Sequence, residues 1–574
     1  MVLLSLLLQT ILIIFGSRRK TNARSWFRIL VWSAYLSADS VATFALGNLA
    51  SRSQGDSSDT ITAYSIEDNE LWLRHLLGLV VQVIVAFYVF SRSWGSGILT
   101  FIAIPMFVVG IAKYAERTWD LVLGIGELIR SRTLISKNEA DGAFKVVEVE
   151  LGLIYDMLYT KAPLIYSRGG IILRCIISLL SVTAFITFQV KIDKHDDCLM
   201  TDIAITYLLF AAAVFLEFYA FLCLVFSDWT MIWLIGEGGN PLTSALYSQI
   251  RKLTRSERWS RSISQYNLIS SLIEREPPKF LEFLGIDEMM RQMNVNRKDL
   301  NVGLQGLIFE HLREKAQKIK EDFNVYDKNV RSKVIGQRGD GVLEREGLLQ
   351  DYKWCTTEVE FSRSILVWYL ATHICYRVDK DGSNVSTEDG RCLSEYMMYL
   401  LVIRPNMLSK GFGDKEYQFT LQDLWGLKDR GPDDEKYQRT LREFRNGESR
   451  GPDDGESQHR WKREKSVLYG VERLARQLQS LGPNEKRWRM IEEVWIEMVA
   501  YAAAHCPWKE HTHQLRRGGE LLTHVSLLML HLGLSEQYEY NEFDNFWQLT
   551  EVRIPKILLK YVDRYCIFLG VRKK

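Results

Sequence analysis

The sequence IAITYLLFAAAVFLEFYAFLCLVF, at residues 203–226, is apolar throughout except for one acidic side chain, Glu217. A hydrocarbon core about 30 Å thick is crossed by about 20 apolar residues in a helix. Backbone amides in lipid must find their hydrogen-bond partners within the same segment, so a run of this kind is expected to be helical. The stretch therefore predicts a transmembrane helix.

Further apolar runs lie on the N-terminal side of this stretch, at residues 2–16, 29–49, 71–90, 97–112 and 171–190. The first run is followed, not preceded, by basic residues (SRRK, 17–20), which favours a retained short span over a cleaved signal peptide. Residues 1–230 are thus predicted to form a bundle of about six transmembrane helices. The protein is expected to be a multi-pass integral membrane protein of the plasma membrane or an endomembrane.

The loop charges leave the sidedness of the C-terminal region open. The connection 17–28 is rich in Arg and Lys, whereas residues 50–70 carry mainly acidic side chains. Basic short loops stay in the cytosol. With six spans the C-terminal region lies outside the cytosol, and with five it lies inside. The sequon Asn384-Val385-Ser386 is a candidate glycosylation site in the first case only.

Two acidic residues fall at membrane depth, Asp39 in the second run and Glu217 in the sixth. Ionisable groups inside a span are costly and often functional, so the pair is a candidate ion or proton path. The alternative is that both are buried polar groups that fix helix packing. The sequence does not choose between these interpretations.

The composition excludes several function classes. The chain has 574 residues and a formal net charge of +2, so nothing in its charge indicates a nucleic-acid partner. Its 8 cysteines are irregularly spaced and predict neither a disulfide framework nor a zinc site. The histidines between 505 and 531 lack metal-ligand spacing, and the glycine-rich stretch GQRGDGV (336–342) does not follow a predicted strand. No catalytic motif, metal or cofactor is predicted, and the chain is not expected to be an enzyme.

Beyond residue 230 the pattern is that of amphipathic helices, so the fold class is all-α, with a large soluble helical region after the membrane bundle. We divide it into a helical region 240–409, a charged, disordered linker 410–462, a C-terminal helical module 463–545 and a tail 546–574. The linker contains RGPDD twice, at 430–434 and 450–454. The predicted helices are 244–253, 264–274, 299–322, 342–378, 387–403, 463–481, 485–505 and 514–534.

Several stretches together resemble a known family. They are SAYLSADSVATFALGNLA, TITAYSIEDNELWLRHLLGLVVQV, SILVWYLATHICYRV, SEYMMYLLVIRPNML and GGELLTHVSLLMLHLGL. In this order they resemble the plant, especially grass, membrane proteins that carry domain of unknown function 4220 and, at the C-terminus, domain of unknown function 594. The resemblance implies a multi-span N-terminal region and a helical C-terminal module, with no assigned catalytic residues. The family's WHIATDL motif reads WYLATHI here, with Tyr369 and His373 at its His and Asp positions.

We therefore expect the protein to be a membrane-anchored component that binds other proteins or takes part in signalling. The resemblance implies that it comes from a plant. Its expected partners are the lipid bilayer and proteins that bind the soluble helical region. The alternative is an ion channel or transporter that uses Asp39 and Glu217.

Overall fold

The computed structural model describes residues 2–16, 140–160, 168–191, 200–227, 229–230, 259–273, 295–322, 328–380, 387–408, 467–482 and 484–534, with scattered positions between 18 and 91. The first helices are α1 (Val2–Gly16), α6 (Ala140–Tyr159), α8 (Arg168–Lys191) and α9 (Met200–Val225). The middle of the chain forms β1 (Ser262–Gln265), α12 (Leu268–Ile273), β2 (Asn296–Asp299), α15 (Val302–Asp322), α16 (Lys328–Ile335), α17 (Asp340–Arg345), α18 (Leu349–Tyr352), η2 (Lys353–Cys355), α19 (Phe361–Lys380), α20 (Glu388–Ile403) and η3 (Pro405–Met407). The last helices are α24 (Val467–Ser480), α25 (Asn484–His505), α26 (Trp508–Leu515) and α27 (Leu521–Leu532).

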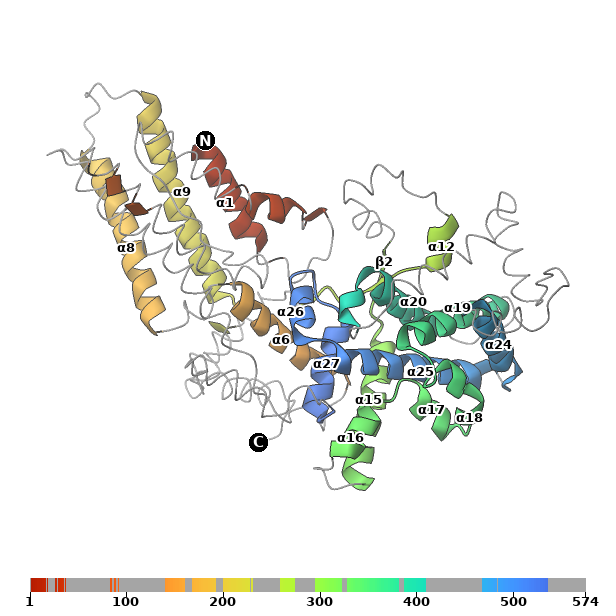
Figure 1. The fold of residues 1–574 in the computed structure, drawn as a ribbon. Coiled ribbons are helices and arrows are strands. Elements are labelled where there is room, and N and C mark those ends of the chain that lie inside the picture. The colour runs from red at the N-terminus through yellow and green to blue at the C-terminus, as the bar shows by residue number, and fades with distance from the viewer. Residues whose placement is uncertain are drawn as a thin grey trace.

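The long apolar helices α8 and α9 lie side by side as an antiparallel hairpin, with α1 near α9 (Figure 1). Ala184 and Phe188 of α8 pack against Tyr207 and Phe210 of α9. Among the described residues, two segments are long and apolar enough to cross a membrane, Gly170–Val190 and Ile203–Val225. The helix α1 is shorter, and the predicted spans 29–49, 71–90 and 97–112 lie largely outside the described residues. Of the six predicted spans, 171–190 and 203–226 are thus helices of membrane length and 2–16 is the shorter α1, while the other three stay predictions.

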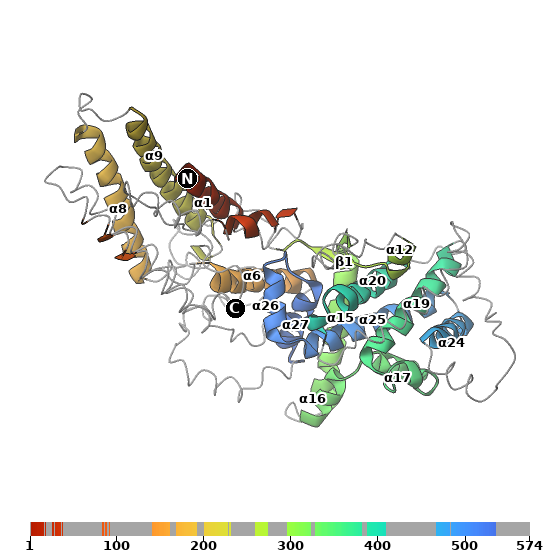
Figure 2. The same ribbon diagram turned by 45° about the horizontal axis from the view of Figure 1, so that its top comes forward.

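The second part of the molecule is a helical core built around α25 (Figures 1 and 2). Helices α17, α20 and α27 pack on α25, and α19 packs between α20 and α24. Large side chains fill the interior, among them Trp368, Trp488, Trp495 and Phe309, each less than 2% exposed. Amphipathic periodicity places these residues on inward faces, which explains why the predicted helices at 299–322, 387–403, 463–481 and 485–505 are confirmed as α15, α20, α24 and α25.

Helix α6 precedes the membrane-length hairpin in sequence but belongs to the C-terminal core. It contacts α15, α26 and α27, and its buried residues Phe144, Val147 and Leu151 join the same hydrophobic cluster as those helices. The predicted membrane region, 1–230, therefore contributes one helix to the core. Because α8 begins shortly after α6 ends, the hairpin is connected directly to this packed helix.

A short antiparallel sheet departs from the all-α prediction. Strands β1 and β2 pair with Ser262 opposite Asp299 and Gln265 opposite Asn296. The predicted helix 264–274 is wrong at its start, because β1 hydrogen-bonds to a strand about 30 residues away and sequence periodicity does not report such pairing. The helix begins only after Asn267, whose side-chain oxygen accepts the Ser270 N–H at 3.0 Å and so caps α12. The described fold is predominantly helical with this one sheet.

Two other predicted helices are each divided by a glycine turn. Residues 342–378 form α17, α18, η2 and α19 instead of one helix, and the first break falls at Gly347, whose φ of 72° is left-handed. Residues 514–534 are divided at Gly518 and Gly519, with φ of 93° and 79°, between α26 and α27. Glycine adopts these angles at no steric cost, so both breaks follow from the sequence once the turns are recognised.

Candidate functional site

Buried polar contacts join α6 to the last two helices. The Glu150 carboxylate of α6 lies 2.6 Å from His531 Nε2 of α27, and both side chains are almost fully buried. Nearby, the Tyr159 hydroxyl donates to the Thr512 carbonyl of α26 at 3.1 Å. A buried charged group must be compensated by a partner, so these contacts fix α6 to α26 and α27.

The segment that precedes β1, residues 259–261, contacts α27 and the turn before it. We call these contacts, together with those of α6, the junction. The indole of Trp259 stacks on the His524 imidazole, with ring centroids 3.6 Å apart and an interplanar angle of 24°. The Ser260 N–H donates to the Gly518 carbonyl at 3.2 Å. A Cβ at Gly519 would lie 2.6 Å from Trp259 Cδ1, so only glycine fits the approach of the two chains.

A two-pronged ion pair orients the segment that carries Trp259. Arg261 Nε and Nη2 each donate at 3.0 Å to the two oxygens of Glu148 on α6. This bidentate geometry is the strongest form of a guanidinium–carboxylate contact. Arg261 has a φ of 47°, which is uncommon for a non-glycine residue.

Glu520 is the last residue of the turn 518–520, and its carboxyl is buried in the core. It accepts a hydrogen bond from the Tyr399 hydroxyl at 2.9 Å, and burial raises its pKa above the ordinary value. The neighbouring Tyr396 hydroxyl accepts the Leu522 N–H at 2.9 Å, at the start of α27. The polar residues of the GGELLTHV stretch thus have internal partners, and the motif has a clear structural role.

Three of the histidines that lack metal-ligand spacing, His511, His524 and His531, are buried in the helical core. His511 Nδ1 lies 3.1 Å from Thr523 Oγ1, while His524 and His531 contact different partners although they share a helix face. Burial lowers the pKa of His511 to about 4 and that of His524 to about 3. Both side chains are therefore neutral imidazoles at physiological pH. Within the described ranges, no three His, Cys, Asp or Glu side chains are grouped so that they could hold a metal ion.

These buried imidazoles predict a pH-dependent stability. Burial also lowers the pKa of His311 to about 4 and that of His373 to about 3. Below pH 6.5 the unfolded chain binds protons that the folded chain does not, so the free energy of unfolding should fall as the pH decreases towards 4. The carboxyls of Glu492, whose pKa is raised to about 7, and of Glu520, Asp340 and Asp389, whose pKa values are also raised, oppose this trend. The carboxyls of Glu388 and Glu497, whose pKa values are lowered, act in the same direction as the four imidazoles, so six groups outnumber four.

The measurement is urea unfolding of the detergent-solubilised chain between pH 4.5 and 7.5, followed by tryptophan fluorescence. In His511→Gln, the slope of stability against pH should decrease by about 1.4 kcal/mol per pH unit, the contribution of one proton, below pH 6. Above pH 7 the difference between variant and parent should be constant, because only lost contacts remain. A variant whose slope matches the parent's would contradict this assignment.

A further buried carboxylate, that of Glu497 on α25, lies at the glycine-rich stretch 336–342. Its Oε2 accepts the N–H groups of Gly339, Gly341 and Val342 at 2.8, 3.0 and 3.3 Å, and its other oxygen pairs with Lys315. Burial alone would raise the pKa of Glu497, but Lys315 and the loop N–H groups hold it below its ordinary value. Backbone N–H groups arranged in this way bind anions, and here the chain's own carboxylate is the anion.

The predicted membrane residues are only partly described. Glu217 is buried in α9, where its Oε2 accepts a hydrogen bond from the Ser178 hydroxyl of α8 at 3.5 Å. Asp39 and Asn384 lie outside the described residues, so the proposed Asp39–Glu217 pair and the glycosylation site stay predictions. At the variant motif, the Tyr369 hydroxyl accepts the Leu268 N–H at 3.1 Å and His373 is buried.

Sequence reasoning missed Glu148, Glu150 and Glu497. Each is an acidic residue on the inward face of a predicted or observed helix, where a charged side chain indicates a buried partner. That signal is visible in the sequence, but the identity of each partner is not, because the partners are more than 100 residues away.

The fold thus combines an apolar helical hairpin with a helical core that is held together by buried polar contacts. Models of two families match the chain: the domain of unknown function DUF4220 at residues 32–130 and 120–271, and the protein family of unknown function DUF594 at 481–534. The chain belongs to the family of proteins in which DUF4220 is followed by DUF594, as the resemblance predicted. No curated protein and no solved structure matches it.

The junction lies between the two family regions. Glu148, Glu150 and Trp259 fall within the DUF4220 match, whereas His524 and His531 fall within the DUF594 match. The two regions therefore share one hydrophobic core although they are separated by about 200 residues of sequence.

Proposed function

We propose that the protein is an integral membrane protein whose helical C-terminal core binds protein partners, with a binding or signalling role and no catalysis. The observation that carries this proposal is the exposed apolar surface of α8 and α9. Leu179, Val190 and Phe215 are 69%, 73% and 61% exposed. Soluble proteins rarely expose a large contiguous apolar surface, and a lipid bilayer is the environment that would remove these side chains from water.

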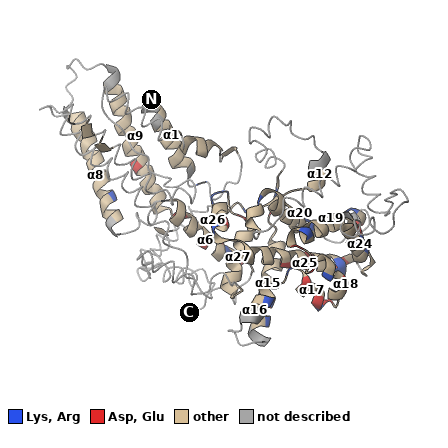
Figure 3. Cartoon of the chain, in the orientation of Figure 1, with Lys and Arg blue, Asp and Glu red and all other residues tan. Residues whose placement is uncertain are grey.

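Charge distribution supports the same assignment. Figure 3 places charged residues over the helices of the C-terminal core, while α1, α8 and α9 are almost uncharged. The 21 residues of Gly170–Val190 span about 30 Å as a helix, which equals the thickness of the hydrocarbon core. The multi-pass arrangement, with further spans in residues 29–112, is part of this proposal.

A binding role for the core rests on its polar clusters. Glu148, Glu150, Glu497 and Glu520 are buried and each has an internal partner, as expected of groups that hold a scaffold together. Catalytic groups instead meet a substrate in a cleft. A rigid helical scaffold fixed to a membrane is suited to presenting its outer faces to other proteins.

Membrane integration is tested by alkaline carbonate extraction of membranes from cells that express the full chain. The protein should stay in the pellet and be released by detergent; recovery in the carbonate supernatant would overturn membrane integration. Partner binding is tested by crosslinking and affinity purification of the full chain, because the core includes α6 and a C-terminal fragment would lack it. Failure to enrich any protein over a matched membrane protein would count against the interaction role.

The alternative, an ion or proton pathway, is favoured by one observation, the burial of Glu217 between α8 and α9. If Glu217 conducts, Glu217→Gln should abolish or strongly reduce ion flux in reconstituted vesicles, because the amide cannot carry charge. If Glu217 only holds the helices together, the vesicles should show no flux with either protein. Ser178→Ala separates the roles further, since it removes the helix-packing hydrogen bond and leaves the carboxyl.

A further inference from the structure

The cysteines among the described residues form two groups. Four are buried in the helical core: Cys355, Cys375, Cys392 and Cys506. Burial raises the pKa of each of these four thiols. The thiolate is the reactive form of cysteine, so these side chains are both inaccessible and unreactive. The other two, Cys175 of α8 and Cys223 of α9, are exposed. Within the described ranges, the exposed thiols therefore both lie on the apolar hairpin.

Cys175 and Cys223 lie at nearly the same level of the hairpin. The Ser178 hydroxyl of α8 donates to Glu217 of α9 at 3.5 Å, so these two residues face each other in the antiparallel pair. Cys175 precedes Ser178 by three residues, and Cys223 follows Glu217 by six. Both thiols are therefore on the same side of that contact, and their levels along the helices differ by three residues, about 4.5 Å.

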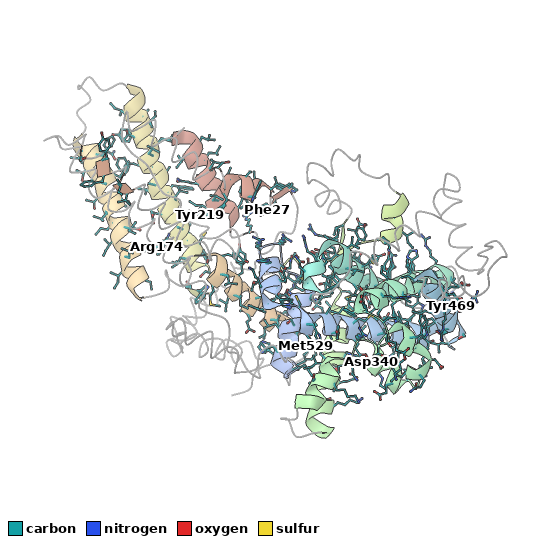
Figure 4. All side chains as sticks on the ribbon, in the orientation of Figure 1. Phe27, Arg174, Tyr219, Asp340, Tyr469 and Met529 are labelled. Atoms are coloured by element: carbon teal, nitrogen blue, oxygen red, sulfur yellow. The ribbon has the colours of Figure 1, made fainter. Side chains whose placement is uncertain are left out.

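This level is close to the end of the hairpin that faces the core. Helix α8 begins and α9 ends on the side next to the core (Figures 1 and 2). Arg174 and Tyr219, labelled in Figure 4, mark the level on the two helices. Cys175 directly follows Arg174, and Cys223 is one turn beyond Tyr219, with which its side chain is hydrogen-bonded.

Both thiols are near the ends of the segments that are long enough to cross a membrane. Cys175 is five residues from the start of the apolar segment of α8, and Cys223 is two residues from the end of that of α9. In a helix these separations are about 8 Å and about 3 Å. If the hairpin spans a bilayer, both thiols lie just beneath the lipid headgroups on the side of the core.

Exposed apolar side chains surround the two thiols. On α8 the exposed face that contains Cys175 continues at intervals of three or four residues: Ile171, Leu179, Val182 and Ile186. Such intervals keep residues on one face of a helix, so this apolar strip leads from the thiol towards the middle of the bilayer. On α9 the exposed side chains of Leu222 and Phe226 lie next to Cys223. A hydrocarbon chain attached to either sulfur would therefore lie on apolar surface.

We propose that Cys175 and Cys223 are S-acylation sites, each taking a long-chain acyl group such as palmitoyl from acyl-coenzyme A through a membrane S-acyltransferase. The cysteine sulfur forms a thioester with the acyl carbonyl carbon, and the bond from that carbon to the sulfur of coenzyme A breaks. The cysteine proton goes to the released coenzyme A thiol, and no oxidant or reductant takes part. Cysteines beside a membrane span are typical substrates of this reversible modification.

This inference rests on the proposed membrane insertion and adds a modification at one end of the hairpin. Each methylene group of an acyl chain that enters lipid strengthens the attachment to the membrane. Two acyl chains at this level fix the depth of the hairpin where it joins the core. Acyl-coenzyme A is supplied by the cytosol, so acylation also places this end of the hairpin, and the core next to it, on the cytosolic side.

The test uses the full chain, expressed in eukaryotic cells that are fed an alkyne analogue of palmitate. Free thiols are blocked, thioesters are cleaved with hydroxylamine, and each released thiol is coupled to a polymer that adds a fixed mass. We expect Cys175→Ala and Cys223→Ala each to lose one mass step relative to the parent, and the double variant to lose two. The alkyne signal should decrease in the same order.

Cys198→Ala is the matched control. Cys198 belongs to the connection 192–199, which joins the other ends of α8 and α9 and lies outside the described residues. Its substitution should leave the number of mass steps unchanged. A double variant with as many steps as the parent would overturn the proposal, as would a parent without any hydroxylamine-sensitive step.

Carbonate extraction of the same samples separates this outcome from a failure of the proposed function. A parent chain that stays in the membrane pellet without acyl groups contradicts S-acylation alone. A parent chain in the supernatant contradicts membrane insertion. The alanine variants should stay in the pellet, because the apolar helices themselves cross the membrane.

Discussion

Replacing Glu497 with alanine is expected to lower the free energy of unfolding by about 3–5 kcal/mol, the cost of breaking a buried ion pair from one side. The carboxylate is 1% exposed and accepts three backbone N–H groups as well as pairing with Lys315. Removing it leaves the buried N–H groups at the start of α17 and the partly buried Lys315 ammonium without their partner. Either loss alone costs about 1–3 kcal/mol.

The measurement is urea unfolding of the detergent-solubilised chain at pH 7.5. Glu485→Ala is the control, because Glu485 is an exposed acid in the first turn of the same helix, where its loss should cost less than about 1 kcal/mol. Adding Lys315→Met to Glu497→Ala should recover about 1–3 kcal/mol relative to the sum of the single effects, since it removes the stranded charge. Equal losses in the two alanine variants would show that the loop does not depend on Glu497.

Glu497 also marks the limit of inference from this sequence. The sequence argues against a nucleotide-binding loop at GQRGDGV, because no predicted strand precedes it. In the structure, the N–H groups of this stretch bind the Glu497 carboxylate. The helix that supplies the carboxylate, α25, is predicted from amphipathic periodicity within one residue of its observed bounds. The contact itself joins residues separated by more than 150 positions, and no local pattern encodes a partner at that distance.

The same contrast holds for the membrane and core parts. Apolar length alone predicts α8 and α9, because the thickness of lipid fixes how many residues a span needs. The position of α6 could not be predicted in this way. Its sequence is amphipathic, with Glu148 and Glu150 on a largely buried helix, and only the presence of Arg261 and His531 makes burial of those carboxylates tolerable.

Replacing Gly519 with alanine is expected to destabilise the protein by about 2–4 kcal/mol, through two separable effects. Its φ of 79° is left-handed, which costs a non-glycine residue about 1 kcal/mol. A Cβ would also lie 2.6 Å from Trp259 Cδ1 and 2.9 Å from Nε1, so the stacked Trp259–His524 pair must move. Overpacking of this kind typically adds about 1–3 kcal/mol.

Gly533→Ala provides a matched control for the backbone effect. Gly533 has the same φ of 79°, but no atom lies within 4 Å of a Cβ built there. Its substitution should therefore cost only the left-handed backbone term, about 1 kcal/mol. The difference between the two variants in urea unfolding isolates the contact between the DUF4220 and DUF594 regions.

Trp259→Ala on the other side of the contact completes the argument. Deleting this buried indole should cost about 3–5 kcal/mol on its own. In the Trp259→Ala background, Gly519→Ala should lose its overpacking effect and cost no more than Gly533→Ala, because the clashing ring is gone. If Gly519→Ala remains as costly without the indole as with it, the two family regions are not held together by this contact. If the cost falls to that of Gly533→Ala, the overpacking comes from the Trp259 ring, and this contact joins the DUF4220 and DUF594 regions.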